Sequence, residues 1–369
     1  MTLELNSQKL KKIIDLIERV SGKHMTLPVL SCILIEVKKG FAVFKSTNLD
    51  VGIEASIPVK TDEEGVFAVP ASIIASFVSQ ISNDNQIVKI ENSSSGNLLI
   101  TTPKSKGTIK TQPFDDFPTI PKIVDGQEFV IQAEVLLKGL KSVWYSSSVS
   151  SVKPELSSVF VYKNQNDLVF AATDSFRLAE KRIKITNISN FNDILIPFKN
   201  IPDILRVLET INGNIKVLVS KNLISFETEE VYLVSRLIDG VFPDYKQIIP
   251  KTFSTEVVLL KQELINALKI SNIFSDKFNQ VHFSIDSKEK SIKIQTKNND
   301  VGENTTSVEA STSGDKVEIN FNYKYIYDCF QSIDSDSLSL QLTGTNRPMV
   351  IRPVSGDQTF MYLVMPMNR

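Results

Sequence analysis

A strand followed by a helix recurs three times along the chain at nearly equal intervals. Alternating apolar residues predict short strands at 3–5, 129–131 and 257–259, and apolar residues with helical spacing follow each of them. The intervals of 126 and 128 residues are close to a third of the 369-residue chain. A period of this length predicts three copies of one domain. We expect these copies at residues 1–124, 125–250 and 251–369.

Each predicted copy combines several strands with two helices. The first helix is expected to begin near Ser7, a plausible N-cap, and the corresponding helices follow the strands at 129–131 and 257–259. Second amphipathic helices are predicted over 70–81, 197–208 and 322–333. Further strands are predicted over 30–37, 41–46, 158–162, 168–172, 216–219 and 281–285, and the polar stretches 146–151 and 298–315 are expected to be loops. The pattern predicts an α+β fold, in which two helices cover one face of an antiparallel sheet in each copy.

The charge of the chain is balanced overall but uneven in its placement. Because 41 Lys and Arg residues face 42 Asp and Glu residues, the net charge is −1, and no strong field attracts the protein to nucleic acid or membrane. The six predicted helices hold eleven basic and seven acidic residues. Amphipathic helices often expose lysine on a solvated face, so this excess alone is only weak support for nucleic-acid binding.

Scarce residue types exclude several kinds of site. Cys32 and Cys329 lie about 300 positions apart in apolar stretches, which predicts two reduced, buried thiols. His24 and His282 are the only histidines, so the sequence offers little material for a metal site or a Ser-His-Asp triad. No window approaches the roughly 20 apolar residues of a membrane helix, and the charged N-terminus does not resemble a secretory signal. We expect a cytoplasmic protein with no metal, no cofactor and no membrane partner.

Six such domains arranged in a circle would leave room for duplex DNA. Two helices per domain, side by side at about 9 to 10 Å, give a circumference of about 110 to 120 Å and a hole of roughly 25 Å. One chain supplies three domains, so two chains would have to close head to tail. Weak positive charge on the helices could then face the phosphates without a fixed register.

Four segments of the chain are similar to one known family. They are Thr-Leu-Pro-Val-Leu-Ser at 26–31, Ala-Thr-Asp-Ser-Phe-Arg-Leu-Ala at 172–179, Asp-Gly-Val-Phe-Pro-Asp-Tyr-Lys-Gln-Ile-Ile-Pro at 239–250, and Tyr-Leu-Val-Met-Pro-Met at 362–367. With the threefold period, they make the chain resemble the bacterial DNA polymerase III β subunits, the sliding clamps. The resemblance implies a homodimeric ring that encircles duplex DNA and catalyses nothing. The implied partners are double-stranded DNA, a second copy of the chain, the clamp loader, the polymerase α subunit and other proteins that carry a clamp-binding motif.

The resemblance also implies a pocket between the second and third domains that binds a short linear peptide of the type Gln-x-Leu-x-Phe. Apolar side chains would form its adaptable wall, and an arginine with backbone groups would orient the polar parts of the peptide. Carried over position by position, the pocket residues are Leu156, Thr173, Ser175, Phe176, Arg177, Leu178, Pro243, Ile248, Pro348, Leu363 and Met365, with Asn322 and Tyr325 at the edge. Without the resemblance, the segment around Asp174 and Ser175 would be interpreted as a plain hairpin turn, and 365–367 as an edge strand.

Subunit and DNA contacts follow from the resemblance in the same way. The subunit contact would use Ile273 and Phe274, an exposed apolar pair that a partner would cover, and Gly107 stands where an aromatic residue can enter the dimer seam. DNA contacts would come from Lys23, His24, Ser150, Lys153 and Lys199. The chain departs from the family pattern at His24 in place of arginine, at Ser72 in place of a basic residue, at Pro154-Glu155 in place of two tyrosines, and at Phe176 in place of histidine or tyrosine.

Two other classes of function stay open at this point. Carboxylates such as Asp174 and Asp244 could bind a metal for phosphoester hydrolysis, although the sequence lacks clustered ligands and a Gly-rich phosphate loop. The chain could also be a monomeric peptide-binding scaffold with no role on DNA, which sedimentation would distinguish from a dimer.

Overall fold

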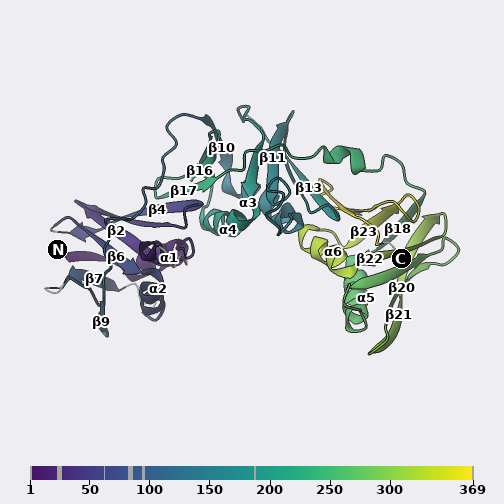
Figure 1. Ribbon diagram of the computed structural model, residues 1–369, viewed down its shortest axis with the longest axis horizontal. Coiled ribbons are helices and arrows are strands. Elements are labelled where there is room, and N and C mark those ends of the chain that lie inside the picture. Colours follow the sequence, from purple (N-terminus) through teal and green to yellow (C-terminus); the bar gives the residue numbers. More distant parts are fainter. Residues whose placement is uncertain are drawn as a thin grey trace. The chain divides into compact units, whose positions relative to one another are not determined.

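The computed structural model describes residues 2–22, 27–61, 63–81, 86–93, 96–186 and 188–367. By their contacts the residues form two compact units. The first comprises Met1–Leu136, Ile188–Asn192 and Lys199–Leu237, and the second comprises Leu137–Asn187, Asp193–Phe198 and Ile238–Arg369. Each unit consists of antiparallel sheet with helices packed on it (Figure 1), which confirms the α+β prediction.

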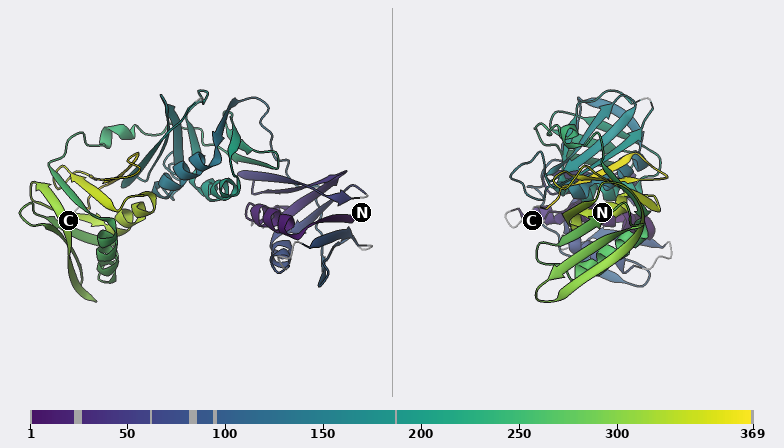
Figure 2. Two further views of the ribbon diagram at one scale, coloured as in Figure 1. Left: turned by 180° about the vertical axis from the view of Figure 1, so that it is seen from behind. Right: turned by 90° about the vertical axis from the view of Figure 1, so that its right-hand side faces the viewer.

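The first repeat belongs to the first unit. Its helices are α1 (Ser7–Glu18) and α2 (Ala71–Ser79), and a 3-10 turn, η1, covers Pro28–Ser31. Its strands are β1 (Thr2–Asn6), β2 (Cys32–Lys38), β3 (Phe41–Thr47), β4 (Val51–Pro58), β5 (Lys60–Thr61), β6 (Gly65–Pro70), β7 (Ile87–Asn92), β8 (Leu98–Thr101) and β9 (Lys106–Ile109). Figure 2 shows α1 and α2 packed side by side, and the apolar stripe of α1 is buried above β3 and β4.

The second repeat is divided between the two units. Its helices are α3 (Ala133–Val143) and α4 (Ile201–Thr210), with 3-10 turns η2 (Trp144–Ser146) and η3 (Phe198–Asn200). Its strands are β10 (Gln127–Gln132), β11 (Ser158–Asn164), β12 (Asp167–Thr173), β13 (Arg177–Lys184), β14 (Ile194–Pro197), β15 (Asn214–Val219), β16 (Leu223–Glu227) and β17 (Val231–Arg236).

The third repeat belongs to the second unit. Its helices are α5 (Lys261–Ile273) and α6 (Tyr323–Asp328), and η5 (Cys329–Ser332) continues α6. Its strands are β18 (Thr255–Leu260), β19 (Gln280–Ile285), β20 (Ser291–Asn298), β21 (Gly302–Gly314), β22 (Val317–Asn322), β23 (Ser337–Leu342), β24 (Met349–Pro353) and β25 (Phe360–Val364). A further 3-10 turn, η4 (Tyr245–Ile248), lies in the segment between β17 and β18.

Neighbouring repeats are joined by the same kind of strand pair. In the first unit, β4 of the first repeat pairs antiparallel with β17 of the second, with Gly52 opposite Val234. In the second unit, β13 of the second repeat pairs with β25 of the third, with Leu178 opposite Leu363. The strands β4, β13 and β21 hold corresponding places in their repeats, as do β9, β17 and β25. In each repeat, three consecutive antiparallel strands follow the first helix. Each junction therefore joins the third of these strands to the last strand of the next repeat.

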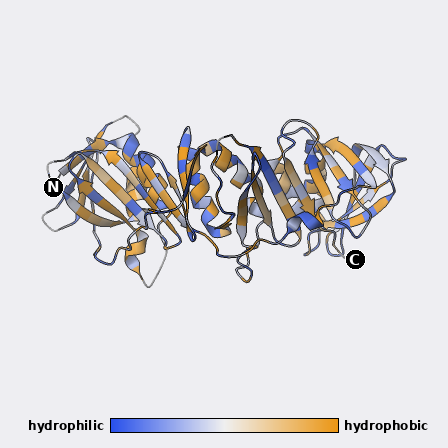
Figure 3. Ribbon diagram, turned by 90° about the horizontal axis from the view of Figure 1, so that it is seen from above, coloured by the Kyte–Doolittle hydropathy of each residue, from blue (hydrophilic) through white to orange (hydrophobic). Residues whose placement is uncertain are grey.

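The core of each repeat lies between its helices and its sheets. Strands such as β1, β19 and β20 alternate buried and partly exposed residues, and the same alternation of apolar and polar positions is visible along the ribbon in Figure 3. Period-2 burial of this kind is what one covered face and one solvated face produce.

Three local predictions were wrong. The N-cap of α1 is Asn6, whose side chain accepts hydrogen bonds from the amides of Gln8 and Lys9, while Ser7 is the first helical residue. Residues 30 and 31 belong to η1, so the predicted strand begins at Cys32. The supposed loop 298–315 is mostly the 13-residue strand β21, the green hairpin strand in Figures 1 and 2. Its polar residues are tolerated because much of β21 is solvent-exposed, and pairing with β20 and then β18 satisfies its backbone.

Candidate functional site

The hairpin between β12 and β13 presents Phe176 to solvent. One carboxylate oxygen of Asp174 accepts hydrogen bonds from the amides of Phe176 and Arg177 at 2.9 and 3.0 Å, and Ser175 adopts a left-handed conformation with φ of 77°. The Thr173 hydroxyl donates to the Arg177 carbonyl at 2.7 Å. These bonds fix the turn, so the Phe176 ring is held outward with 59% of the residue exposed.

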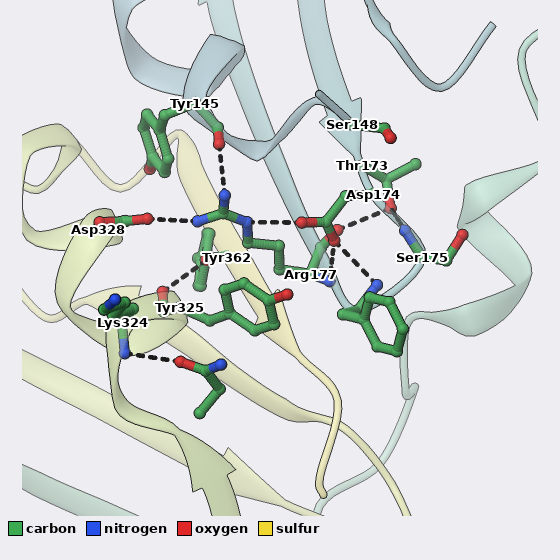
Figure 4. A network of polar contacts seen from close by, with 12 residues as sticks. Tyr145, Ser148, Thr173, Asp174, Ser175, Arg177, Lys324, Tyr325, Asp328 and Tyr362 are labelled. Atoms are coloured by element: carbon green, nitrogen blue, oxygen red, sulfur yellow. Dashed lines mark hydrogen bonds and ion pairs between the residues drawn. The ribbon is translucent and has the colours of Figure 1, made fainter. Parts of the chain in front are cut away.

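Arg177 is the centre of a polar network inside the second unit (Figure 4). Its Nε donates to Asp174 at 3.0 Å, one Nη donates to Asp328 at 2.5 Å, and the other donates to the carbonyl of Tyr145 at 2.7 Å. Burial alone would lower the pKa of Arg177, but the neighbouring Tyr362 and the two carboxylates together raise it. Because each of its three guanidinium nitrogens donates one hydrogen bond within the chain, Arg177 holds the hairpin against η2 and α6.

The floor below the hairpin is apolar and closed. Leu178 and Leu363 face each other across the β13–β25 pair and are fully buried. They share one hydrophobic cluster with Val350 and Tyr245, and Met365 packs against that cluster while it is still partly exposed. The Met365 amide donates to the Phe176 carbonyl at 2.8 Å. Of the predicted pocket residues Leu178, Leu363 and Met365, only Met365 is partly exposed, because Leu178 and Leu363 form the core beneath it.

Two residues predicted at the edge of the site are on or beside α6. The Tyr325 ring stacks near Phe176, with 6.4 Å between ring centroids, and lies 4.7 Å from the Arg177 guanidinium carbon. The Tyr325 carbonyl accepts a hydrogen bond from the Tyr362 hydroxyl at 2.6 Å. Asn322 is the N-cap of α6, since its side chain accepts from the Lys324 amide at 3.0 Å. Tyr325 therefore lies beside the hairpin, while the side chain of Asn322 is occupied as a cap.

The remaining predicted pocket residues lie on three further segments. Pro243 and Ile248 are exposed in the segment that precedes β18. Leu156 is buried, and its carbonyl accepts from the Ser148 amide at 2.8 Å. Pro348 is buried directly before β24. The part of these four residues in a pocket stays a prediction.

Family models match the chain in three consecutive pieces. They are described as the N-terminal, central and C-terminal domains of the DNA polymerase III beta subunit, and they match residues 1–121, 130–244 and 246–368. The chain belongs to the DNA polymerase III beta subunit family. Members of this family are sliding clamps, which are non-catalytic processivity factors of DNA polymerase.

Relatives of known name and structure agree over the whole length. The beta sliding clamps of a Synechocystis species and of Synechococcus elongatus are 26% and 25% identical to the chain, and each comparison covers 100% of this chain and 99% of the relative. Among solved structures, the DNA polymerase III beta subunit of Thermotoga maritima superposes with a TM-score of 0.93 at 27% identity over 100% of this chain and 99% of the other. A sliding clamp of Pseudomonas aeruginosa bound to griselimycin gives a TM-score of 0.92 at 25% identity, with 100% of both chains covered.

The DNA contacts suggested by the clamp family fall in different surroundings. Ser150 and Lys153 lie in the exposed loop after η2. Lys199 donates to Asp50 at 2.6 Å, so part of its charge is compensated within the first unit. Lys23 and His24 lie outside the described residues. Ser72 is exposed on α2, where the family pattern has a basic residue.

The two suggested subunit-contact regions are arranged differently. Ile273 is 65% exposed at the end of α5, and Phe274 is partly buried near Gly302. On the first repeat, Gly107 in β9 leaves room for the Phe77 ring, which lies 2.6 Å from where a β-carbon at position 107 would be. The space beside β9 that an aromatic residue at position 107 would fill is thus taken by Phe77 from α2.

The alternative of a carboxylate metal site finds no support in the geometry. Asp174 is bonded to the hairpin and to Arg177, and Asp244 accepts from the Gln247 side chain at 2.8 Å. Across 2–22, 27–61, 63–81, 86–93, 96–186 and 188–367, no three His, Cys, Asp or Glu side chains are grouped so that they could hold a metal ion. Within the same ranges, no helix has both the length and the apolar character to cross a bilayer.

Sequence reasoning missed the residues that hold the site together. Asp328 and Tyr145 fix Arg177, and Glu180 with Tyr245 fixes the segment that carries Pro243 and Ile248. No local signal marks them: Glu180, for example, stands among the charged residues of β13, directly before Lys181 and Arg182. Because their partners lie far away in the sequence, spacing alone could not identify them.

Proposed function

We propose that two copies of the chain close head to tail into a ring around duplex DNA and hold a polymerase there through a peptide pocket on the third domain's border with the second. The supporting observation is the repeated junction. β4 pairs with β17 and β13 pairs with β25, while β9 and the first half of β21 have no strand on their outer edge among the described residues. The third pair of the series would be β21 of one copy with β9 of a second copy, if the rule holds once more.

The two internal junctions also give a register for this pair. The internal junctions place Val234 opposite Gly52 and Leu363 opposite Leu178. When these positions are followed across the paired strands of each repeat, the equivalent pair of the third junction is Thr108 opposite Glu303. The same register sets Thr305 opposite Lys106. Glu303 would then have the diagonal neighbours Lys106 and Lys110, which favours this pairing electrostatically.

Apolar side chains beside both edges favour the same contact. On the first repeat, Ile73 is 53% exposed on α2, one turn before Phe77. On the third repeat, Ile273 and Phe274 end α5. At the junction of the second and third repeats, the corresponding elements are η2 and η5, where the Ser332 hydroxyl contacts the Tyr145 hydroxyl at 3.0 Å. We assign Ile73 and Phe77 to the seam together with Ile273, Phe274 and Gly107.

The subunit contact can be tested with engineered cysteines. Lys106→Cys combined with Thr305→Cys should give a cross-linked dimer on mild oxidation, because directly opposed β-residues have the Cα separation that a disulfide needs. Thr108→Cys with Thr305→Cys is the control that is two residues out of register. Sedimentation of the unmodified chain as a 41 kDa monomer at micromolar concentration, or equal cross-linking of both pairs, would contradict the proposed seam.

Encirclement has a topological test. Protein loaded by an ATP-dependent clamp loader should stay on circular DNA and be lost when that DNA is linearised. Equal retention on both forms would indicate ordinary binding to DNA. The contacts would come from Lys23, His24, Ser150, Lys153 and Lys199, and the small net charge predicts that these contacts are weak and salt-sensitive.

The peptide pocket would be formed by the hairpin of Phe176, the floor over Leu178 and Leu363, and the segment with Pro243 and Ile248. Phe176→Ala with Ile248→Ala should weaken binding of a polymerase-derived Gln-x-Leu-x-Phe peptide by at least tenfold, since truncated apolar anchors typically cost more than 1 kcal/mol each. Ile87→Ala, at an equally exposed position on β7, is the matched control. Unchanged peptide affinity in the double variant would refute the pocket.

The domain borders and the location of the protein belong to the same proposal. We place the domains at 1–124, 125–250 and 251–369, because the intervals between β9 and β10 and between β17 and β18 contain these borders. A clamp that serves a bacterial polymerase works with the chromosome in the cytoplasm. The loader, the polymerase α subunit and other proteins with a clamp-binding motif are its expected partners.

A further inference from the structure

The segment between β17 and β18 is anchored by two side chains that alternate with its exposed residues. The Phe242 ring stacks on Phe160, with 4.8 Å between centroids and 11° between ring planes. Tyr245 is buried in the cluster that contains Leu178. Pro243 lies between these two anchors, and Ile248 follows Tyr245 by one turn of η4. Whatever holds Tyr245 therefore also determines where Pro243 and Ile248 stand.

A buried chain of hydrogen bonds holds Tyr245. Its hydroxyl donates to one carboxylate oxygen of Glu180 and lies 2.9 Å from the Tyr162 hydroxyl, which can donate to it in turn. Arg182 donates to the other Glu180 oxygen at 2.8 Å. Burial raises the pKa of Tyr245, and the negative charge of Glu180 raises it further, so the phenol keeps its proton and donates. Glu180 is itself 4% exposed, and a buried carboxylate of this kind depends on such donors.

The first junction provides a natural comparison. Glu54 has the same place on β4 that Glu180 has on β13, because Glu54 is opposite Tyr232 and Glu180 is opposite Met361 in equivalent ladders. Glu54 holds the segment between β9 and β10 through Lys122, whose ammonium lies 2.6 Å from the carboxylate and 3.5 Å from the centre of the Tyr232 ring. Each glutamate thus anchors the linker of its own junction, one through a half-exposed lysine and the other through a buried tyrosine.

We propose that the Glu180–Tyr245 hydrogen bond is the positioning contact that fixes Pro243 and Ile248 as one wall of the peptide pocket. This inference rests on the proposed peptide-binding function. Tyr245 and Glu180 need not touch the peptide. They act through the backbone, because Tyr245 and Ile248 belong to the same turn, η4, and Pro243 lies two residues before it.

The test is peptide affinity in full-length protein. Tyr245→Phe keeps the ring in the cluster and removes only the hydroxyl, and it should raise the Kd of a Gln-x-Leu-x-Phe peptide about tenfold, the size expected for the loss of a hydrogen bond to a charged group. Glu54→Gln is the matched control, because it weakens the equivalent anchor of the other linker. It should leave the peptide Kd unchanged.

A double-mutant cycle separates positioning from general destabilisation. In an Ile248→Ala background the wall is already lost, so Tyr245→Phe should change the Kd less than twofold. An equal tenfold loss in both backgrounds, or no loss in either, would overturn the inference. Absence of peptide binding by the unmodified protein would instead refute the proposed function, so the two failures are distinguishable.

Discussion

An ion triad around the buried Lys181 gives a quantitative test of the structure of the second unit. Lys181 on β13 is only 2% exposed, and its ammonium lies 2.6 Å from Asp357 in the turn between β24 and β25. Lys138 on α3 lies 2.6 Å from the same carboxylate oxygen, but its side chain is half exposed. Burial would raise the pKa of Asp357, yet the hydrogen bonds from the two lysines outweigh it and hold the pKa well below its usual range.

Asp357→Asn should destabilise this unit by about 3 kcal/mol. Removing one partner of a buried ion pair leaves an uncompensated charge, which typically costs about 3 to 5 kcal/mol, and Lys138 adds a like charge beside Lys181. Lys181→Met should be nearly neutral, because an apolar side chain of similar volume replaces the buried charge and Asp357 keeps Lys138. Lys138→Ala should cost less than about 1 kcal/mol, as exposed ion pairs do.

The chain contains its own reporter for this measurement. Trp144 is the only tryptophan, and it stacks on Phe198 within the same unit, with 5.4 Å between ring centroids. Its fluorescence should follow thermal unfolding, and 3 kcal/mol corresponds to a fall in Tm of about 6 to 12 °C for a unit of this size. Because the folded-state pKa of Asp357 is depressed, its contribution is present above about pH 4 and is lost as the pH falls below that value. Wild type and Asp357→Asn should converge in acid.

Two results would refute this reasoning. A loss of less than 1 kcal/mol for Asp357→Asn would mean that Lys181 is hydrated or finds another partner. A loss as large for Lys181→Met as for Asp357→Asn would mean that packing of the aliphatic stem, and not the unpaired charge, determines the cost.

Three further predictions use the same unfolding assay or its pH dependence. Burial raises the pKa of Asp203 in α4 to about 6 despite Arg206. The folded state therefore holds this proton more tightly than the unfolded state, and stability falls as the pH rises from about 4 to 6. Asp203→Asn should be about 2 kcal/mol more stable than wild type at pH 7.5 and show no gain at pH 4. Gly139→Ala should destabilise by several kcal/mol, since a β-carbon there would lie 2.2 Å from the Phe170 ring, and a higher Tm would contradict the observed packing of α3. Arg177→Lys should lower the Tm by several degrees, because one ammonium cannot reach both carboxylates and the Tyr145 carbonyl; an unchanged Tm would show that the network is dispensable.

Period and pattern predicted the larger architecture correctly. The helices near 7–20, 70–81 and 322–333 were found because apolar residues at helical spacing are a local property of the sequence. The strand β21 was missed for the opposite reason. Its Ser, Thr and Asn residues carry no apolar alternation, and its conformation follows from pairing with β20 and β18, which are neighbours only in the folded chain.

In the candidate site, too, local features were predicted from the sequence and long-range ones were not. The hairpin of Thr173 to Arg177 could be located because its turn chemistry is local. Leu178 and Leu363 were expected at the pocket wall, but their pairing across two repeats buries both of them. A sequence can show that a residue is apolar, whereas its exposure depends on which distant strand covers it.

The sequence by itself determined the threefold repeat, the helices and the family, because these depend on periodicity and on short ordered motifs. Only the tertiary structure decided that Arg177 bonds to Asp328 and Tyr145, that the Phe77 ring fills the space beside Gly107, and that Glu180 holds Tyr245. Each of these is a contact between residues separated by about 30 to 150 positions. Coulombic, hydrogen-bonding and packing energies depend on distance in space, and chain folding alone sets that distance.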